Sequence, residues 1–112
     1  MAFPAHTAPN DLIFYSHDQF PDRYKNGAFI AFHGSWNRSP QVQEGYYVAF
    51  VPFDKKLPSA NWEVFADGFA GVDVINSPDD AVHRPMGLAQ GIDGSLYISD
   101  SVRGTVWRIF YQ

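Results

Sequence analysis

The chain has 112 residues, no cysteine, and a formal net charge of −4 from 8 basic and 12 acidic side chains. The absence of cysteine excludes disulfides, cysteine-ligated metal or iron–sulfur sites and thiolate catalysis. Scattered basic residues on an acidic chain also argue against binding to a nucleic-acid backbone. With 46% hydrophobic residues, the composition indicates at most one folded domain and not a disordered segment.

The chain carries no recognisable targeting or membrane-spanning segment. Its longest apolar runs, such as Ala28 to Phe32 and Tyr46 to Pro52, are much shorter than the roughly 20 residues that cross a bilayer. The segment from Met1 to Pro9 lacks both the basic and the apolar region of a signal peptide. We therefore predict no membrane span and no signal peptide here.

Short runs rich in Phe, Tyr, Val and Ile lie between the 9 glycines and 8 prolines, which is typical of strands separated by turns. No stretch shows the apolar stripe of an amphipathic helix. The pattern predicts an all-β, antiparallel protein. The predicted strands, in chain order, are Leu12 to Ser16, Ala28 to His33, Tyr46 to Phe53, Trp62 to Gly68, Met86 to Gln90, Ser95 to Asp100 and Thr105 to Tyr111.

The strand pattern repeats within the chain. The segment Lys25 to His33 and the segment Ile92 to Asp100 both consist of a turn followed by a strand. Asn26-Gly27 in the first matches Asp93-Gly94 in the second, and each pair is predicted to form a two-residue hairpin turn with positive φ. The match extends on both sides, with Gly45 to Val51 against Gly104 to Phe110 and Ala8 to Leu12 against Arg84 to Leu88.

A repeated unit of this kind is typical of β-propeller blades. Residues 5–70 are predicted to form a complete four-stranded blade, 71–83 a loop, and 84–112 three strands of the next blade. A blade with an open side exposes unpaired backbone groups. We therefore expect the chain to be a fragment of a longer propeller or to close with further copies of itself.

Five sequence segments, in this order and spacing, resemble the C-terminal part of the glucose/sorbosone dehydrogenase family, and the resemblance extends from about Ala5 to Tyr111. The segments are His6 to Pro9, Phe32 to Ser39, Gly45 to Phe53, Arg84 to Gly87 and Asp93 to Asp100. Members of this family are sugar dehydrogenases that are built on a six-bladed propeller and depend on pyrroloquinoline quinone. The chain departs from the family pattern at Asn10-Asp11, where a carboxylate stands on the first strand.

The resemblance implies oxidation of a sugar hydroxyl by hydride transfer to the quinone, with calcium nearby and a periplasmic or secreted location. It places the catalytic histidine and the calcium ligands in earlier blades, so this chain is expected to supply cofactor contacts but no catalytic base and no metal ligands. The alternative is a non-catalytic module, lectin-like or a scaffold, that closes by homo-oligomerisation, for instance as a trimer. The molar mass in solution distinguishes the two.

Arg84 is the first candidate for contacting the cofactor. Its guanidinium is a rigid fork that matches a carboxylate, and pyrroloquinoline quinone carries carboxylates. From the residues alone, an ion pair with Asp79 or Asp80 in the preceding loop is an equal alternative, and the resemblance favours the cofactor. His33 and His6 are further candidates, because a histidine facing a channel can hydrogen-bond a quinone oxygen or a bound water. The alternative for both is a structural role in holding loop backbone.

Trp36 and Arg38 complete the candidate cofactor contacts. A tryptophan stacks on a flat ring or fills a hydrophobic gap between blades, and the gap is the favoured interpretation here. Arg38 reaches the pocket or faces solvent. Asp100 occupies the repeat position of His33, where a carboxylate caps a loop through backbone N–H groups, so we expect a structural role for it. The hairpin turn at 54–56 is expected to be solvated surface.

Overall fold

The computed structural model describes residues 1–35, 42–72 and 74–112 of the chain. In these ranges the fold is all-β, with two short 3₁₀ turns, η1 (Asp22–Tyr24) and η2 (Pro78–Asp80). The strands are β1 (Pro9–Phe14), β2 (Ala28–Phe32), β3 (Tyr47–Val51), β4 (Phe53–Asp54), β5 (Leu57–Pro58), β6 (Glu63–Ala66), β7 (Pro85–Gln90), β8 (Leu96–Asp100) and β9 (Val106–Ile109).

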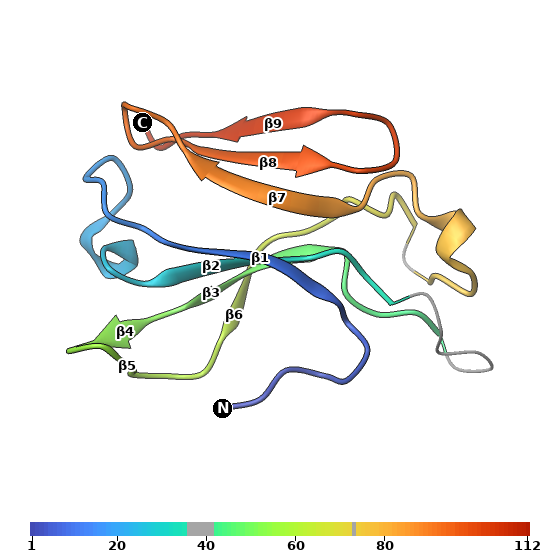
Figure 1. The fold of residues 1–112 in the computed structure, drawn as a ribbon, viewed down its shortest axis with the longest axis horizontal. Helices are drawn as coiled ribbons and strands as arrows, with labels where there is room; N and C mark the ends of the chain where they lie inside the picture. The colour runs from blue at the N-terminus through green and yellow to red at the C-terminus, as the bar shows by residue number, and fades with distance from the viewer. Residues whose placement is uncertain (36–41, 73) are drawn as a thin grey trace.

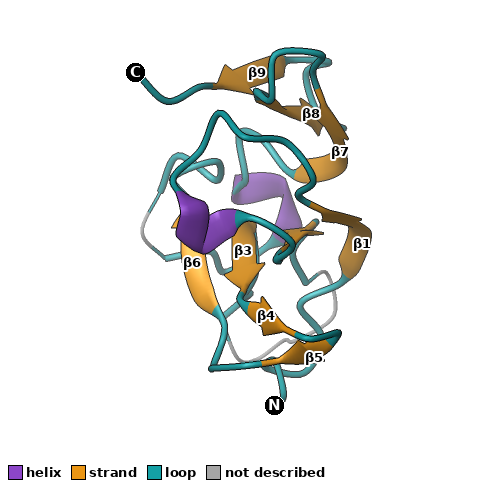
Figure 2. Cartoon of the chain, turned by 90° about the vertical axis from the view of Figure 1, so that its left-hand side faces the viewer, coloured by secondary structure: helices purple, strands orange, loops and turns teal. Residues whose placement is uncertain are grey.

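The strands form two antiparallel sheets and one small hairpin. The first sheet has four strands in the order β1-β2-β3-β6, the second has three in the order β7-β8-β9, and β4 pairs with β5. The sheets lie over each other as two layers (Figure 1), which the view in Figure 2 shows from the side. The predicted all-β, antiparallel class is confirmed. Each predicted run overlaps a strand, although the first strand covers Pro9–Phe14 and not Leu12 to Ser16.

The core lies between the two sheets and follows from side-chain alternation along each strand. On β8, Leu96 and Ile98 are fully buried against the four-stranded sheet, whereas Tyr97 and Ser99 point to the other face and are half-buried. The opposing sheet and the loops beside it contribute mainly aromatic rings. The buried members of this core are Tyr15, Phe20, Phe29, Val48, Phe50, Phe69, Leu96 and Ile98.

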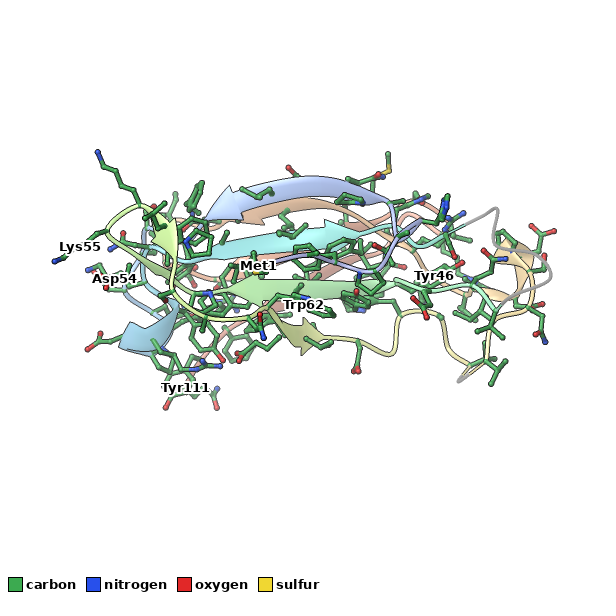
Figure 3. The ribbon with its side chains drawn as sticks, turned by 90° about the horizontal axis from the view of Figure 1, so that it is seen from below. Met1, Tyr46, Asp54, Lys55, Trp62 and Tyr111 are labelled. Carbon is green, nitrogen blue, oxygen red and sulfur yellow. The ribbon has the colours of Figure 1, made fainter. Side chains whose placement is uncertain are left out.

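Strand β2 is buried on both faces because the outer face of its sheet is also apolar. Ala28, Ile30 and Phe32 point to that outer face, where the N-terminal segment brings Phe3 against the rings of Phe32 and Trp62. Figure 3 shows this segment running across the sheet from Met1. The first sheet therefore has one face against the second sheet and the other only partly covered.

The two predicted two-residue hairpins are not observed. Asn26 adopts a φ of 63° and Gly94 a φ of 88°, but their neighbours Gly27 and Asp93 do not have positive φ. The connections are longer than two residues: β1 and β2 are joined by residues 15–27, which include η1, and β7 and β8 by residues 91–95. At Gly27 an ideal Cβ would lie 2.4 Å from the ring of Phe50, so glycine is needed there for close packing.

A two-residue hairpin does occur between β4 and β5, where Asp54 pairs with Leu57. The two linking residues, Lys55 and Lys56, have φ of 50° and 73°. This is the type I′ geometry, which asparagine and glycine adopt most easily. Each lysine is therefore held in a backbone conformation that is strained for its residue type.

The connections place the loops at two ends of the molecule. Residues 6–8, 33–35, 44–46, 83–84 and 100–105 come together at one end, which we call the loop end, and the β4–β5 hairpin lies at the other (Figure 1). No helix in the described part of the chain is long and apolar enough to cross a membrane.

Candidate functional site

Arg84 lies at the centre of the loop end, immediately before β7. Its Nε donates to the carbonyl oxygen of His33 at 2.9 Å, and its Nη2 donates to that of Gly34 at 2.8 Å. The guanidinium carbon lies 5.6 Å from the centre of the Tyr46 ring, within the range of a cation–π contact. Arg84 thus joins the start of β7 to the loop that follows β2 and links the two sheets.

The carbonyls that bind Arg84 are held by close backbone packing. The N–H of His33 donates to Ala8 O at 2.8 Å, and that of Gly34 donates to Thr7 O at 3.1 Å. Gly34 has a φ of 95°, and an ideal Cβ on the neighbouring Gly45 would lie 2.7 Å from the Cα of Gly34. Only glycine fits at these positions, so the acceptors of Arg84 are fixed by backbone and not by mobile side chains.

Asp100 holds Arg84 from the other side. Its carboxylate accepts hydrogen bonds from the backbone N–H of Arg84 at 2.8 Å, of Val102 at 3.1 Å and of Arg103 at 2.7 Å. The His83 Nδ1 lies 3.1 Å from Asp100 Oδ2, and the Asp100 side chain is fully buried. The structural role predicted for Asp100, as a cap on this loop, is confirmed.

The hydrogen bonds to Asp100 decide its charge state. Burial alone would raise the pKa of the Asp100 carboxyl, because it disfavours the charged form. The backbone donors of Arg84 and Arg103, together with His83 and Val102, outweigh burial and hold the pKa well below its usual range. A carboxylate is therefore present beside Arg84 throughout the neutral and mildly acidic range.

His33 is half-buried next to this group. Its Nε2 lies 2.6 Å from the hydroxyl oxygen of Ser101. Burial lowers the pKa of the His33 imidazole, and the neighbouring Arg84 charge lowers it further, whereas Asp100 acts in the opposite direction. The net effect favours a neutral ring, which can either accept or donate a hydrogen bond at Nε2, depending on its tautomer.

We expect the His33 ring to titrate below 6.5, the ordinary value for histidine, and the Arg84→Ala substitution to raise its pKa by removing the nearby positive charge. Proton chemical shifts of the histidine rings, followed against pH by NMR, measure both effects. Arg103→Ala serves as a control, because it removes a charge from the same end of the molecule. An unchanged His33 pKa in the Arg84→Ala variant would contradict the proximity of the two charges.

The other candidate residues have different surroundings. His6 is exposed at the loop end with a φ of 61°, and Ala8 has a φ of 56°. Trp36 and Arg38 lie outside the described residues. Asp80, a predicted alternative partner of Arg84, instead accepts hydrogen bonds from the backbone of Asn76 and Ser77.

Two residues of the loop end and one residue on β1 make contacts that the sequence did not predict. Tyr46 contacts the Arg84 guanidinium and Ser101 contacts the His33 ring. Tyr46 was predicted only as the start of a strand, and no role was predicted for Ser101. Asp11, noted only as a departure from the family pattern, accepts a hydrogen bond from the Leu88 backbone N–H at 2.8 Å. The β7–β8 register shifts between Pro85 and Leu88, and the Asp11 carboxylate bonds the backbone N–H at the end of this shift. Asp11 thereby connects β1 to β7.

The donor set at the loop end suits an anionic, oxygen-rich ligand. Two N–H groups of the Arg84 guanidinium are used by carbonyls, and the rest have no hydrogen-bond partner among the described residues. The His33 imidazole contacts the Ser101 hydroxyl and lies near the Arg84 charge. Within the described ranges, no group of three or more His, Cys, Asp or Glu side chains is arranged to hold a metal ion.

Comparison with known proteins adds three relationships. The sequence pattern of the TrAA12-like family matches residues 1–112. An uncharacterized protein of Borreliella burgdorferi is 36% identical over 110 residues, covering 97% of this chain and 27% of the relative. A pyrroloquinoline quinone-dependent pyranose dehydrogenase of Coprinopsis cinerea is 30% identical over 123 residues, covering 97% of this chain and 16% of the relative. No solved structure matches significantly.

Proposed function

The chain belongs to the TrAA12-like family, and from this membership we propose that it supplies part of the cofactor site of a quinone-dependent sugar dehydrogenase. The similarity to a pyranose dehydrogenase that depends on pyrroloquinoline quinone supports the assignment. The chain spans 27% of the length of the Borreliella burgdorferi relative and 16% of the length of the pyranose dehydrogenase. In this proposal the complete activity therefore belongs to a longer assembly.

In the proposed architecture the two sheets are consecutive propeller blades, similar to the C-terminal blades of a glucose/sorbosone-type enzyme. The repeated strand orders β1-β2-β3 and β7-β8-β9 support this, as does the stacking of the two sheets through one shared core. The first strand of each sheet lies next to that of the other, since Asp11 on β1 bonds Leu88 on β7. In a propeller the first strands line the central channel, so in this proposal the loop end would lie at one mouth of that channel.

The single observation that carries the proposal is the half-buried Arg84 guanidinium, which is anchored by two carbonyls and has donors to spare. A cation fixed by backbone loses little freedom when it binds a carboxylate, and a charge-assisted hydrogen bond is stronger than a neutral one. Arg84 is thus proposed to bind a carboxylate of the quinone. His33, neutral and paired with Ser101, is proposed to hydrogen-bond a ligand oxygen, and His6 to line the same mouth.

When bound, pyrroloquinoline quinone would supply the acceptor for hydride from a sugar hydroxyl. The chain's own residues would orient the quinone and neutralise the charge of its carboxylate. Arg84 would face that carboxylate, and Asp100 keeps the Arg84 backbone in place. The catalytic base and the calcium ligands are proposed to come from other parts of the complete enzyme. Trp36 and Arg38 remain predicted contacts from the same loop.

The test is a titration of the chain with pyrroloquinoline quinone and calcium, read by the absorbance of the quinone. We expect saturable binding that Arg84→Ala weakens by about tenfold, the value of a charge-assisted hydrogen bond, and that Arg84→Lys weakens less. Arg103→Ala is the matched control, because it removes an exposed cation at the loop end and keeps the backbone N–H that binds Asp100.

Two outcomes would overturn the assignment. Equal affinities for the original chain and Arg84→Ala would show that Arg84 does not hold the quinone. The absence of saturable binding by the original chain would show that this chain does not carry the cofactor contacts. Circular dichroism of each variant establishes that the fold is retained.

One observation fits the alternative, a non-catalytic module that closes with copies of itself, as well as it fits the enzyme proposal. On the partly covered outer face of the four-stranded sheet, Leu12 is about half exposed, at 48%. Apolar side chains on a sheet face are normally covered by another layer. In the enzyme proposal that layer is another blade, and in the alternative it is a second copy of this chain.

A further inference from the structure

An open cavity lies at the end of the molecule opposite the loop end. Its volume is about 530 Å³, and it is lined by the end of β1, residues 25 and 26, and the β4–β5 hairpin. Figure 3 shows Asp54 and Lys55 at this end and Tyr46 at the other. The cavity is therefore separate from the proposed quinone site around Arg84.

The floor of the cavity is aromatic. The rings of Phe14 and Phe53 meet edge to face, with their centres 5.1 Å apart and their planes at 80°. Phe14 is 52% exposed, so part of its ring faces the cavity and not the protein. An exposed aromatic pair of this kind offers a flat apolar ligand both a face and an edge to pack against.

The rim of the cavity is mainly basic. Lys25, Lys55 and Lys56 line it together with one carboxylate, that of Asp54. Lys25 is engaged in an ion pair with Asp18, which leaves the two hairpin lysines as the cations for a ligand. A cationic rim over an aromatic floor suits a ligand that combines an anionic group with an aromatic ring.

The backbone of the hairpin adds an independent observation. Lys55 and Lys56 both have positive φ, in a turn type where Asn-Gly is the unstrained choice. Residues in such strained conformations cluster at ligand sites. Both hairpin lysines line the cavity, and an Asn-Gly turn would carry no positive charge there.

We propose that this cavity binds a small aromatic carboxylate, with its ring against Phe14 and Phe53 and its carboxylate against the ammonium groups of Lys55 and Lys56. The site differs from the proposed quinone site in position and in residues. It does not depend on the dehydrogenase assignment.

The test is an NMR titration of the isotope-labelled chain with 2-naphthoate, followed by the backbone amide shifts. The largest changes are expected at Phe14, Asn26 and residues 53–56. The uncharged analogue 2-naphthalenemethanol should bind about tenfold more weakly, because it lacks the charge-assisted hydrogen bonds. The double variant Lys55→Asn/Lys56→Gly removes both charges and introduces the residues that the turn prefers, so the hairpin is kept. Its affinity for 2-naphthoate should also be about tenfold lower.

Equal affinities for the acid and the alcohol, or an unchanged affinity in the double variant, would overturn the proposal. So would naphthoate shifts centred on the loop end, or no saturable shifts at all. Lys55→Arg/Lys56→Arg retains the charge and should retain binding. Arg103→Ala, which removes an exposed cation from the loop end, should leave naphthoate binding unchanged. The two proposals rest on different residues, so failure of one is distinguishable from failure of the other.

Discussion

Replacing Phe29 by alanine is expected to lower the free energy of unfolding by about 3–5 kcal/mol. Phe29 lies on β2 with no exposed surface, and its ring contacts those of several neighbours in the core between the sheets. The contacting rings are those of Tyr15, Phe20, Tyr24, Phe50 and Phe65. Removing this ring leaves a cavity that the rigid strands cannot close. Equilibrium denaturation in urea measures the loss.

The matched control is Phe110→Ala, which deletes the same group from a residue that is 47% exposed. A change of about 0.5 kcal/mol or less is expected there, as for most surface substitutions. If the two variants lose stability equally, the contact between the sheets is not the main core of the protein.

Replacing Asp100 by alanine should lower the free energy of unfolding by about 3–5 kcal/mol, the range for breaking a buried charged network. The substitution leaves the backbone N–H groups of Arg84, Val102 and Arg103 without their acceptor. Unsatisfied buried donors lose their hydration without a replacement bond. Urea denaturation at pH 7 measures the loss, and hydrogen exchange at the three amides should accelerate.

The pH dependence of stability provides a second measurement on Asp100. The folded-state pKa of this carboxyl is below its unfolded value of about 3.9. Its contribution is therefore complete above that pH and is lost progressively as the pH falls below it. The Asp100→Ala variant should lack this part of the acid dependence.

Asp93 is the control for Asp100, since its carboxylate also accepts a backbone N–H, that of Ser95, but is about half exposed. Asp93→Ala should lose much less stability, because water replaces the missing acceptor. An Asp100→Ala variant as stable as Asp93→Ala would mean that the carboxylate does not hold the loop end together.

The sequence alone located the strands of the two sheets, although not the short pair β4 and β5, and showed that the strand pattern occurs twice. Alternating apolar residues between glycines and prolines have a local physical cause, because a strand side chain points to one face or the other according to its position. The repeat also predicted that Asp100 caps a loop, and its carboxylate accepts three backbone hydrogen bonds there. The same local reasoning was wrong for Asn26-Gly27, because Gly27 is required by the ring of Phe50, which comes from a distant strand.

The tertiary structure decided which groups meet. Arg84 binds carbonyls 50 and 51 residues away, and Asp11 binds a backbone N–H 77 residues away. No local pattern encodes such a pairing, because it depends on how two sheets stack and which backbone groups the strand ladders leave unpaired. The sequence specified the strands and the candidate Arg84, whereas packing determined which carbonyls anchor Arg84 and which of its donors remain available.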